Sequence, residues 1–465
     1  MKDCAVLILA AGKGTRMRSR LCKVLHPVAG RPMMAYVVDA VRAAGLTNIA
    51  VVVGHQSSEV KEFFRDEALE FVLQEPQLGT GHAVAAAQPA MDGFSGNVLI
   101  LCGDVPLITP AAIESFIKYH DGQEGLLTVL TTFPEDPSGY GRIIRSGDRS
   151  VARIVEERDA LEEEKAVGEI NTGIYLVDSI LLFQLLERIT PNNAQREYYL
   201  TDIVREAVKE SVTVHAHVLQ DSRQAIGINT RSQLADVAGY IWNRRRESLM
   251  RSGVTLLDPG SVYVDTQVQV GEDTVIHPLV TLSGDTRIGR ECVIESAVTI
   301  IDCRIGDNVG ILQGSRLNRA VVEDGTTIGP MAHLRPETTI GKNARIGNFV
   351  EVKKTVVGDG TKAAHLTYLG DSVIGDGVNI GCGTITCNYD GKKKHPTFIG
   401  NDCFIGSDVQ FVAPVEVGSG SIVGAGSTIT KDVPANSLAV SRAKQRNYPL
   451  RRGQEPGRAD ENRES

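Results

Sequence analysis

Aliphatic residues recur every six positions through most of the carboxy-terminal half of the chain, between residues 262 and 433. Three runs share this spacing: Val270, Ile276, Leu282, Ile288 and Ile294; Ile328, Leu334, Ile340, Ile346 and Val352; and Ile399, Ile405, Phe411, Val417, Val423 and Ile429. An α-helix has 3.6 residues per turn, so a six-residue period would scatter these side chains around its surface. Short strands that each place one aliphatic residue inward and then turn do fit the period. They predict a parallel β-helix whose coils stack about 4.8 Å apart.

Glycine follows many of these aliphatic residues, for example at Gly271, Gly341 and Gly406. An aliphatic residue, a glycine and four variable residues resemble the hexapeptide repeat of left-handed β-helix proteins, which are commonly trimeric acyltransferases. The resemblance implies the left hand and the trimer, whereas the period by itself indicates only the coil. The alternative, a β-sandwich of short strands, does not require aliphatic residues in such strict register.

The six-residue register is interrupted mildly at residues 316–325 and more strongly at residues 355–396. The second interruption is rich in polar side chains, among them His365, Tyr368, Asn379, Asn388 and Tyr389. A coil needs none of these side chains to fold. Their clustering therefore predicts a functional site on the edge of the coil.

The amino-terminal half has a different pattern, with apolar runs at residues 5–9, 49–53, 98–101 and 173–177. Segments with helical spacing separate these runs, such as the positions of Met34, Val37, Val38 and Val41 and an alanine-rich stretch at residues 82–90. The alternation predicts a doubly wound α/β sheet, Rossmann-like, with ligands at the carboxyl ends of its strands. We expect four segments: this domain at 1–228, a helical linker at 229–251, the β-helix at 252–437 and a polar tail at 438–465.

Composition narrows the class of protein. The 465 residues include 49 basic and 57 acidic side chains, a net charge of −8 without a large basic block, which argues against a nucleic-acid partner. Eight cysteines without a Cys-x-x-Cys pair favour reduced thiols over a zinc site or a disulfide framework. We find neither a run long enough to cross a bilayer nor a signal-peptide cleavage pattern, so we expect a cytoplasmic protein that does not bind membranes.

The loop after the first apolar run, residues 10–17, carries small residues with Lys13 and Arg16. It lacks the Gly-Lys-Ser/Thr end of a P-loop and the third glycine of the dinucleotide fingerprint. Small residues still allow backbone N–H groups to approach phosphates, and an arginine can bind phosphate through two nitrogens. Taken alone, this loop is equally consistent with a simple turn.

The loop is the first of several short motifs whose order along the chain supports a more specific interpretation. They are Leu9–Met17, Lys23–His26, Gly30–Met33, Gln77–Gly81, Leu101–Leu107, Tyr140–Arg142, Ile170–Gly173 and Ile226–Asn229. Together they resemble the sugar-nucleotide pyrophosphorylase family of nucleotidyltransferases. The resemblance implies that the first loop and Arg16 hold the triphosphate and that Lys23 binds phosphate. It further implies binding of the uridylyl substrates by Leu9, Ala10, Ala11, Gly12, Lys23, Gln74, Gly79, Thr80, Gly103, Asp104, Gly141, Glu156, Asn171 and Asn229. In this chain Cys22 stands where the family carries proline before the lysine.

Within that set, the family places Mg²⁺ on Asp104 and Asn229 and the N-acetylglucosamine moiety on Gly141, Glu156 and Asn171. One carboxylate and one amide oxygen suit Mg²⁺, which keeps waters and takes phosphate oxygens as further ligands. The reaction is attack of a sugar 1-phosphate oxygen on the α-phosphorus of UTP, with pyrophosphate leaving. Such chemistry depends on positioning and charge neutralisation.

The polar segments of the repeat half resemble the acetyltransferase domain of bifunctional N-acetylglucosamine-1-phosphate uridylyltransferases / glucosamine-1-phosphate N-acetyltransferases. The resemblance covers residues 5 to about 442 and implies that His365 is the general base for acetyl transfer from acetyl-CoA. It implies that the acetyl acceptor is bound by Arg335, Lys353, Tyr368 and Asn379. It implies acetyl-CoA contacts at Cys382, Asn388, Tyr389, Lys394, Ser407, Ala425 and Arg442, with Lys394 reaching from a neighbouring subunit and Cys382 replacing the family's alanine.

We therefore expect a homotrimeric bacterial enzyme of cell-envelope synthesis that acetylates glucosamine 1-phosphate and then joins N-acetylglucosamine 1-phosphate to UTP, giving UDP-N-acetylglucosamine. One alternative is a single-function nucleotidyltransferase whose β-helix is regulatory or structural, and it has no use for His365. A second alternative is a non-catalytic trimeric scaffold, and it has no use for Asp104 together with Asn229.

Overall fold

In a computed structural model, which describes residues 3–449 apart from 55, 124 and 148, the chain divides into two compact units. The first unit takes the chain up to Ser248 together with Val264–Gln267, and the second takes the remainder. Within the predicted linker, helix α8 spans Arg231–Arg251. The predicted tail lies outside the described residues from position 450 onward.

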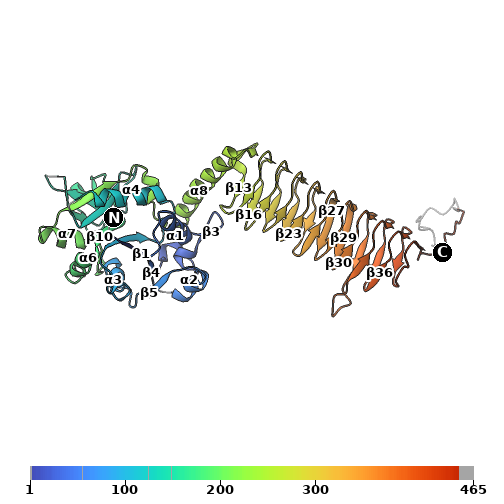
Figure 1. The fold of residues 1–465 in the computed structure, drawn as a ribbon, viewed down its shortest axis with the longest axis horizontal. Coiled ribbons are helices and arrows are strands. Elements are labelled where there is room, and N and C mark those ends of the chain that lie inside the picture. The colour runs from blue at the N-terminus through green and yellow to red at the C-terminus, as the bar shows by residue number, and fades with distance from the viewer. Residues whose placement is uncertain (1–2, 55, 124, 148, 450–465) are drawn as a thin grey trace, which may run out of the picture. The chain divides into compact units, whose positions relative to one another are not determined.

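The first unit is built on a mixed sheet whose main path runs β11-β7-β10-β6-β1-β4-β5 (Figure 1). Strands β1, β4, β5 and β6 are parallel, whereas β10 runs antiparallel to both β6 and β7. The bounds are β1 Cys4–Ala10, β4 Ile49–Val53, β5 Glu70–Leu73, β6 Asn97–Cys102, β7 Leu127–Thr132, β8 Arg142–Arg145, β9 Val151–Val155, β10 Ile170–Asp178 and β11 Val214–Val218, with a small hairpin of β2 Pro27–Val28 and β3 Arg31–Pro32. The predicted apolar runs are thus strands of one sheet.

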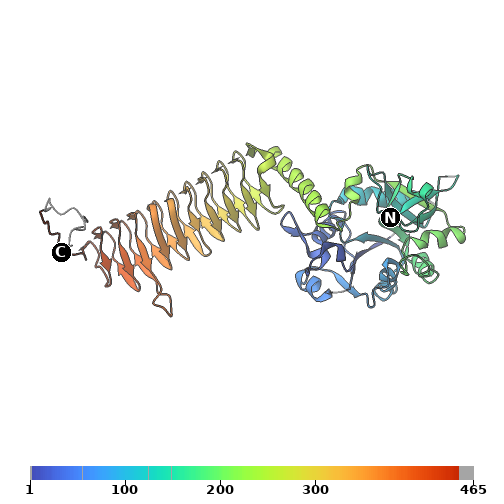
Figure 2. The ribbon, with the colours of Figure 1, turned by 180° about the vertical axis from the view of Figure 1, so that it is seen from behind.

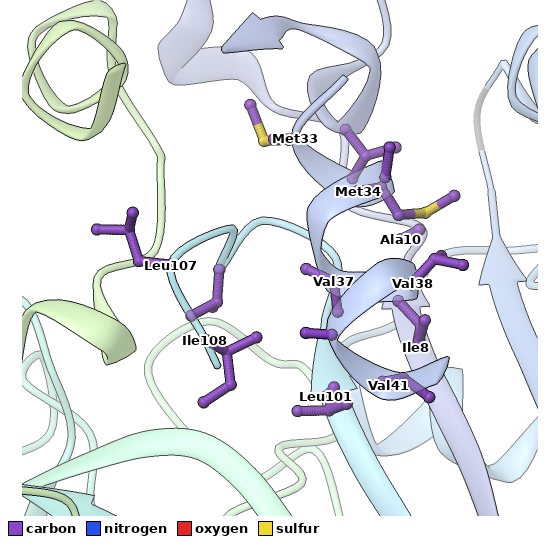
Figure 3. Packing of buried hydrophobic residues seen from close by; sticks show 14 of the residues in the cluster. Ile8, Ala10, Met33, Met34, Val37, Val38, Val41, Leu101, Leu107 and Ile108 are labelled. Carbon is purple, nitrogen blue, oxygen red and sulfur yellow. The ribbon is translucent and has the colours of Figure 1, made fainter. Parts of the chain in front are cut away.

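Helices cover this sheet, and two separate clusters of buried hydrophobic side chains form its cores. The helices are α1 Met33–Ala43, α2 Ser57–Phe63, α3 Thr80–Ala85, α4 Pro110–Asp121, α5 Glu162–Lys165, α6 Ser179–Leu186 and α7 Asp202–Lys209. Figure 3 shows Val37, Val38 and Val41 of α1 packed near Ile8 of β1 and Leu101 of β6. The predicted spacing of α1 is confirmed, because its apolar stripe is buried.

The alanine-rich stretch differs from the expected helix over residues 82–90. Helix α3 begins two residues earlier, at Thr80, and ends at Ala85, and a separate 3₁₀ turn follows at Gln88–Met91. Pro89 has no N–H to donate and its ring clashes with the preceding turn of a helix, so an α-helix cannot continue through it.

The second unit is a parallel β-helix of very short strands (Figure 2). One of its sheets joins two faces of the coil and contains β12 Thr255–Leu256, β13 Tyr263–Val264, β15 Val275–Ile276, β16 Thr281–Ser283, β18 Val293–Ile294, β19 Thr299–Ile301, β21 Gly310–Ile311, β22 Arg316–Asn318, β24 Thr327–Ile328, β25 His333–Leu334, β27 Arg345–Lys353, β29 Lys362–Gly370, β31 Asn379–Ile380, β32 Ile385–Cys387, β34 Phe404–Ile405, β35 Gln410–Val412, β37 Ile422–Val423, β38 Thr428–Ile429 and β39 Leu438–Ala439. The expected fold class, an α/β domain followed by a left-handed parallel β-helix, is confirmed.

The third face of the coil is a separate nine-stranded sheet. Its strands are β14 Gln269–Val270, β17 Arg287–Ile288, β20 Arg304–Ile305, β23 Ala320–Val322, β26 Thr338–Ile340, β28 Val356–Val357, β30 Ser372–Ile374, β33 Thr397–Ile399 and β36 Val415–Val417. The inward residues of successive strands are Ile288, Ile305, Val322, Ile340, Val357, Ile374, Ile399 and Val417. Subtracting these positions in turn gives coils of 17, 17, 18, 17, 17, 25 and 18 residues.

The interruption expected over residues 355–396 is therefore much shorter than the sequence suggested. The coil continues through Val357, Ala363, Leu369 and Ile374, because one corner is built with one residue fewer and the inward step there is five instead of six. The coil between Ile374 and Ile399 is eight residues longer than the 17-residue coil before it, and the additional residues lie in a projecting loop at residues 388–396. The mild interruption at 316–325 is another five-residue step, from Leu317 to Val322.

The coils stack so closely that some corners require glycine. A Cβ placed on Gly347 would lie 1.9 Å from the carbonyl oxygen of Ala364 in the next coil. The glycine that follows an inward aliphatic residue thus has a steric reason in this coil. In the part of the chain that the structure describes, helices are all too short or too polar to cross a bilayer.

Candidate active sites

A cavity of about 460 Å³ opens in the first unit where β1 and β6 end. Of the residues predicted to bind the uridylyl substrates, those that line it are Leu9, Ala10, Ala11, Gly12, Arg16, Lys23, Gln74, Gly79, Thr80, Asp104 and Asn229. Gly103 does not line the cavity, but its N–H donates at 2.9 Å to the carbonyl of Leu9, which does. The fold brings these segments, which are far apart in the sequence, to one site, as expected for the carboxyl ends of parallel strands.

Backbone geometry explains the small residues of the first loop. Gly14 has φ +60°, and a Cβ there would lie 2.7 Å from the Cβ of Lys23, so a larger residue would displace that lysine. A Cβ on Gly12 would meet no atom within 4 Å, so this stretch of backbone faces open space that a phosphate can enter. Across the cavity, the Gln74 side chain donates to the Gly79 carbonyl at 2.9 Å and holds the opposite wall.

Gln77, Cys102 and Glu197 also line this cavity, although they were not among the predicted ligands. The Gln77 amide donates to the Ala11 carbonyl and so joins the two loops. Burial raises the pKa of the Cys102 thiol to about 12, with Asp104 adding to the effect, so Cys102 stays a neutral wall. Gln77 and Cys102 carried a usable signal, because they lie in the Gln77–Gly81 and Leu101–Leu107 motifs.

Two oxygen atoms converge on one cation inside this cavity. The Lys23 ammonium donates to a carboxylate oxygen of Asp104 and, at 2.8 Å, to the amide oxygen of Asn229. Arg16 donates to the same Asn229 oxygen at 2.8 Å. A position that already holds one cation between a carboxylate and an amide oxygen fits a hard divalent ion. Within the described residues there is no cluster of three His, Cys, Asp or Glu side chains that could hold a metal ion.

The three residues predicted to hold the sugar form a second group, apart from the walls of the first cavity. The Asn171 N–H donates to the Gly141 carbonyl at 2.8 Å, and a Cβ on Gly141 would lie 3.6 Å from a carboxylate oxygen of Glu156. Glu156 also borders a smaller cavity of about 240 Å³ together with Tyr199. Burial raises the pKa of Glu156, although the Thr201 hydroxyl donates to it at 3.2 Å.

In the second unit, successive coils align five residues in one column at the same corner. They are Asn348, His365, Cys382, Ser407 and Ala425. Backbone bonds fix the stack, such as Asp408 N–H to the Cys382 carbonyl at 2.7 Å and Gly426 N–H to the Ser407 carbonyl at 2.8 Å. Arg442 ends the column, donating to the Ala425 carbonyl at 2.5 Å.

The hydrogen bond between Asn348 and His365 determines which tautomer the neutral histidine ring adopts. His365 Nδ1 lies 2.8 Å from Asn348 Oδ1, and a carbonyl-type oxygen only accepts hydrogen bonds. Nδ1 therefore carries the proton in the neutral ring, which leaves the lone pair on Nε2. His365 is exposed, so Nε2 is accessible to a substrate. Asn348 was not a predicted site residue.

A cluster of positive charges lies on the neighbouring face of the coil. It contains Arg335, Lys353 and Lys394, of which Arg335 pairs with Glu351 at 2.8 Å. The adjacent Lys394, then burial, and then the charge of Arg335 lower the pKa of Lys353. Lys394 was expected to act from a neighbouring subunit, and in this chain it also lies beside Lys353 of its own subunit. Such a cluster attracts a phosphate dianion.

The remaining predicted residues divide between two places. Asn388 donates to Asp371 at 2.5 Å and lies 3.4 Å from the Tyr368 hydroxyl, so Tyr368 and Asn388 belong to the region of the positive cluster. Asn379, on β31, pairs in register with Lys362 of β29 in the coil before it. Lys362 lies before His365 on β29, whereas Tyr368 lies after it. A single chain therefore does not bring Asn379 together with Tyr368. Tyr389 is exposed on the projecting loop.

Known proteins and protein families resemble this chain in both its amino-terminal and its carboxy-terminal half. Residues 6–166 match the family model of the MobA-like NTP transferase domain, and residues 316–439 match that of the GMPPB C-terminal domain. The "Bifunctional protein GlmU" of Geotalea uraniireducens is 53% identical over 448 residues, covering 96% of this chain and 98% of that protein. The protein of the same name from Geobacter metallireducens is 52% identical with the same coverage. A solved structure of UDP-glucose pyrophosphorylase complexed with UDP-glucose is 19% identical with a TM-score of 0.45, covering 53% of this chain and all of that one.

Proposed function

The chain belongs to the bifunctional GlmU family, and from this membership we propose that each cavity and cluster described above serves one of its two reactions. The first unit transfers a uridylyl group from UTP to N-acetylglucosamine 1-phosphate. The second unit transfers an acetyl group from acetyl-CoA to glucosamine 1-phosphate. The observation that carries the proposal is the His365–Asn348 hydrogen bond at 2.8 Å, because it prepares a free imidazole nitrogen that a structural coil does not need.

For uridylyl transfer, the first cavity holds the nucleotide and the group around Glu156 holds the sugar. The backbone at Gly12 accommodates the phosphates, while Arg16 and Lys23 offset their negative charge. The sugar phosphate oxygen then attacks the α-phosphorus in line as the bond to pyrophosphate breaks. We assign Mg²⁺ to Asp104 and Asn229, where a bound ion would neutralise charge on the phosphates.

Acetyl transfer follows from the column at the coil corner. His365 Nε2 removes a proton from the amine of glucosamine 1-phosphate as its nitrogen attacks the thioester carbonyl, and the CoA thiolate leaves. The cluster of Arg335, Lys353 and Lys394 binds the phosphate of that sugar. Coils stack about 4.8 Å apart, so three coils from His365 to Ala425 span ~14 Å. An extended pantetheine arm fits along this column, with its thioester at His365 and its anionic nucleotide toward Arg442.

One experiment tests both assignments on the same chain. Purified protein is incubated with glucosamine 1-phosphate, acetyl-CoA, UTP and Mg²⁺, with each component omitted in turn, and products are identified by mass spectrometry. UDP-N-acetylglucosamine is expected only in the complete mixture. If N-acetylglucosamine 1-phosphate has to be supplied instead, the acetyltransferase assignment is wrong and the second unit is regulatory or structural.

Exposed apolar residues beside the column support a homotrimer. Leu279, Met331, Phe349 and Leu366 occupy the same corner with φ between 35° and 63°, and their exposed fractions are between 49% and 64%. Left-handed backbone costs such residues about 1–2 kcal/mol each, and exposed apolar patches mark contact surfaces. Leu366 directly follows His365. We therefore propose that this corner packs against neighbouring copies and that the acetyl-transfer site is completed there.

Replacing Phe349 with glutamate is expected to convert the trimer to a monomer and to reduce acetyl transfer strongly, with uridylyl transfer unchanged. A buried carboxylate without a partner costs several kcal/mol, which an assembly of this kind does not tolerate. Light scattering after size-exclusion chromatography measures the assembly. Phe398→Glu is the matched control, because Phe398 is 43% exposed on the opposite, nine-stranded face. A Phe349→Glu protein that stays trimeric would contradict the proposed interface.

A further inference from the structure

Strand β10 leaves regular pairing at the predicted sugar residue Asn171. Asn171 pairs with Thr131 of β7, whereas Ile174 pairs with the adjacent Leu130, so Thr172 and Gly173 form a bulge. Gly173 has φ +79°, a conformation that favours glycine. The Thr172 hydroxyl fills the bulge by donating to the Leu130 carbonyl at 2.7 Å. Bulges beside active sites commonly redirect a side chain, and this one redirects Asn171.

The amide of Asn171 is fixed at both of its ends. Its nitrogen donates to the Tyr175 hydroxyl at 2.8 Å, and its oxygen accepts from the Gly173 N–H at 3.0 Å. In a regular strand, residues four apart are separated by ~13 Å. The bulge together with the long tyrosine side chain brings these two groups into contact. An asparagine amide has two N–H groups and two lone pairs, so one of each remains for a ligand.

Tyr175 is held rigidly under this amide. It is 1% exposed and pairs in register with Ile100 of β6 and Val129 of β7, in the middle of the sheet. Burial, and secondly the nearby Glu156 carboxylate, raise the pKa of Tyr175 well above its ordinary value. The ring therefore stays a neutral phenol, and it lies near both Asn171 and Glu156.

We propose that Tyr175 is a positioning residue for the sugar phosphate in uridylyl transfer. Its hydroxyl fixes the orientation of the Asn171 amide, so that the remaining N–H and lone pair face the sugar. The proposal rests on the proposed function of Asn171 as a sugar contact. Tyr175 itself does not touch the substrate, because its side chain is enclosed in the sheet.

Tyr175→Phe keeps the ring and removes the hydroxyl. We expect KM for N-acetylglucosamine 1-phosphate to rise about fivefold to tenfold, the effect of one hydrogen bond, with KM for UTP and kcat unchanged. Tyr36→Phe is the matched control, since Tyr36 lies on helix α1, away from the sugar group, and its half-buried hydroxyl donates to the Val28 carbonyl of β2 at 2.7 Å. That variant loses a comparable hydrogen bond, and its KM values should match those of the wild type.

A double-mutant cycle with Asn171→Ala separates the two proposals. Asn171→Ala should raise the sugar KM, and Tyr175→Phe should then have no additional effect. If Asn171→Ala leaves the sugar KM unchanged, the proposed contact of Asn171 with the sugar is wrong. If Asn171→Ala raises the sugar KM but Tyr175→Phe leaves it unchanged, or acts equally in both backgrounds, the positioning role of Tyr175 is wrong. Acetyl transfer, measured in parallel, should be unaffected in every variant.

Discussion

Replacing His365 with alanine is expected to lower the rate of acetyl transfer by about 10²–10⁴-fold, the usual contribution of a general base. The Asn348 hydrogen bond at Nδ1 leaves the lone pair of the imidazole on Nε2, and alanine leaves nothing at this position to accept the proton. Uridylyl transfer should be unchanged, because the residues proposed for it lie in the other compact unit. Thiol release from acetyl-CoA measures the first reaction, and pyrophosphate release measures the second.

Two further variants test whether the loss of acetyl transfer is specific to the column that contains His365. His277→Ala removes a half-buried histidine from an earlier coil and should leave both activities unchanged. Asn348→Ala should reduce acetyl transfer less than His365→Ala, since the base is retained but its orientation and tautomer are no longer fixed. Normal acetyl transfer by the His365→Ala enzyme would refute the assignment of the base.

Asp104→Asn is expected to reduce uridylyl transfer by at least about 100-fold while acetyl transfer stays normal. The substitution keeps the shape of the side chain but removes its charge, and metal binding at such a site supplies several kcal/mol of charge stabilisation. The same change removes the ion pair with Lys23, which in this structure contacts Asp104 and Asn229 together. Pyrophosphate release should be followed over a range of Mg²⁺ concentrations, and the half-saturating concentration should rise.

Asp92→Asn serves as the control, because Asp92 is an exposed carboxylate of the same unit outside the cavity. It should retain the wild-type rate at every Mg²⁺ concentration. An Asp104→Asn enzyme with the wild-type rate and the wild-type Mg²⁺ requirement would show that the metal binds elsewhere.

Much of the fold could be predicted from sequence because inward-facing residues repeat with the geometry of their element. The run Ile49–Val53 is strand β4 to the residue, since a strand covered on both faces is apolar throughout. The six-residue period likewise predicted the β-helix, because the inward-facing residue recurs once on each face of the coil. In the sequence alone a five-residue step looks like an interruption, because the shortened corner between Val352 and Val357 has no residue type that distinguishes it from a break.

The candidate sites were predictable where a motif keeps neighbouring residues together, as at residues 9–16 and 103–104, and their roles stay predictions. Contacts between residues of different coils were harder to predict from the sequence. Asn348 lies 17 residues before His365, and their hydrogen bond follows only when the length of that coil is known. Tyr175 was hidden differently, because within an apolar run it resembled an ordinary core residue, and its contact with Asn171 depends on a bulge that the sequence does not reveal.

The coil length of 17 or 18 residues also bears on how such a chain tolerates genetic change. Loss or duplication of one complete coil before Asn348, such as the 17 residues between Ile288 and Ile305, would shift all later coils as a rigid block and leave their stacking intact. A change of three residues within a coil would instead move inward aliphatics to the surface. The projecting loop at residues 388–396 escapes this rule, because it leaves and rejoins the coil at one corner. Length variation among related chains should therefore occur in whole coils or at corners.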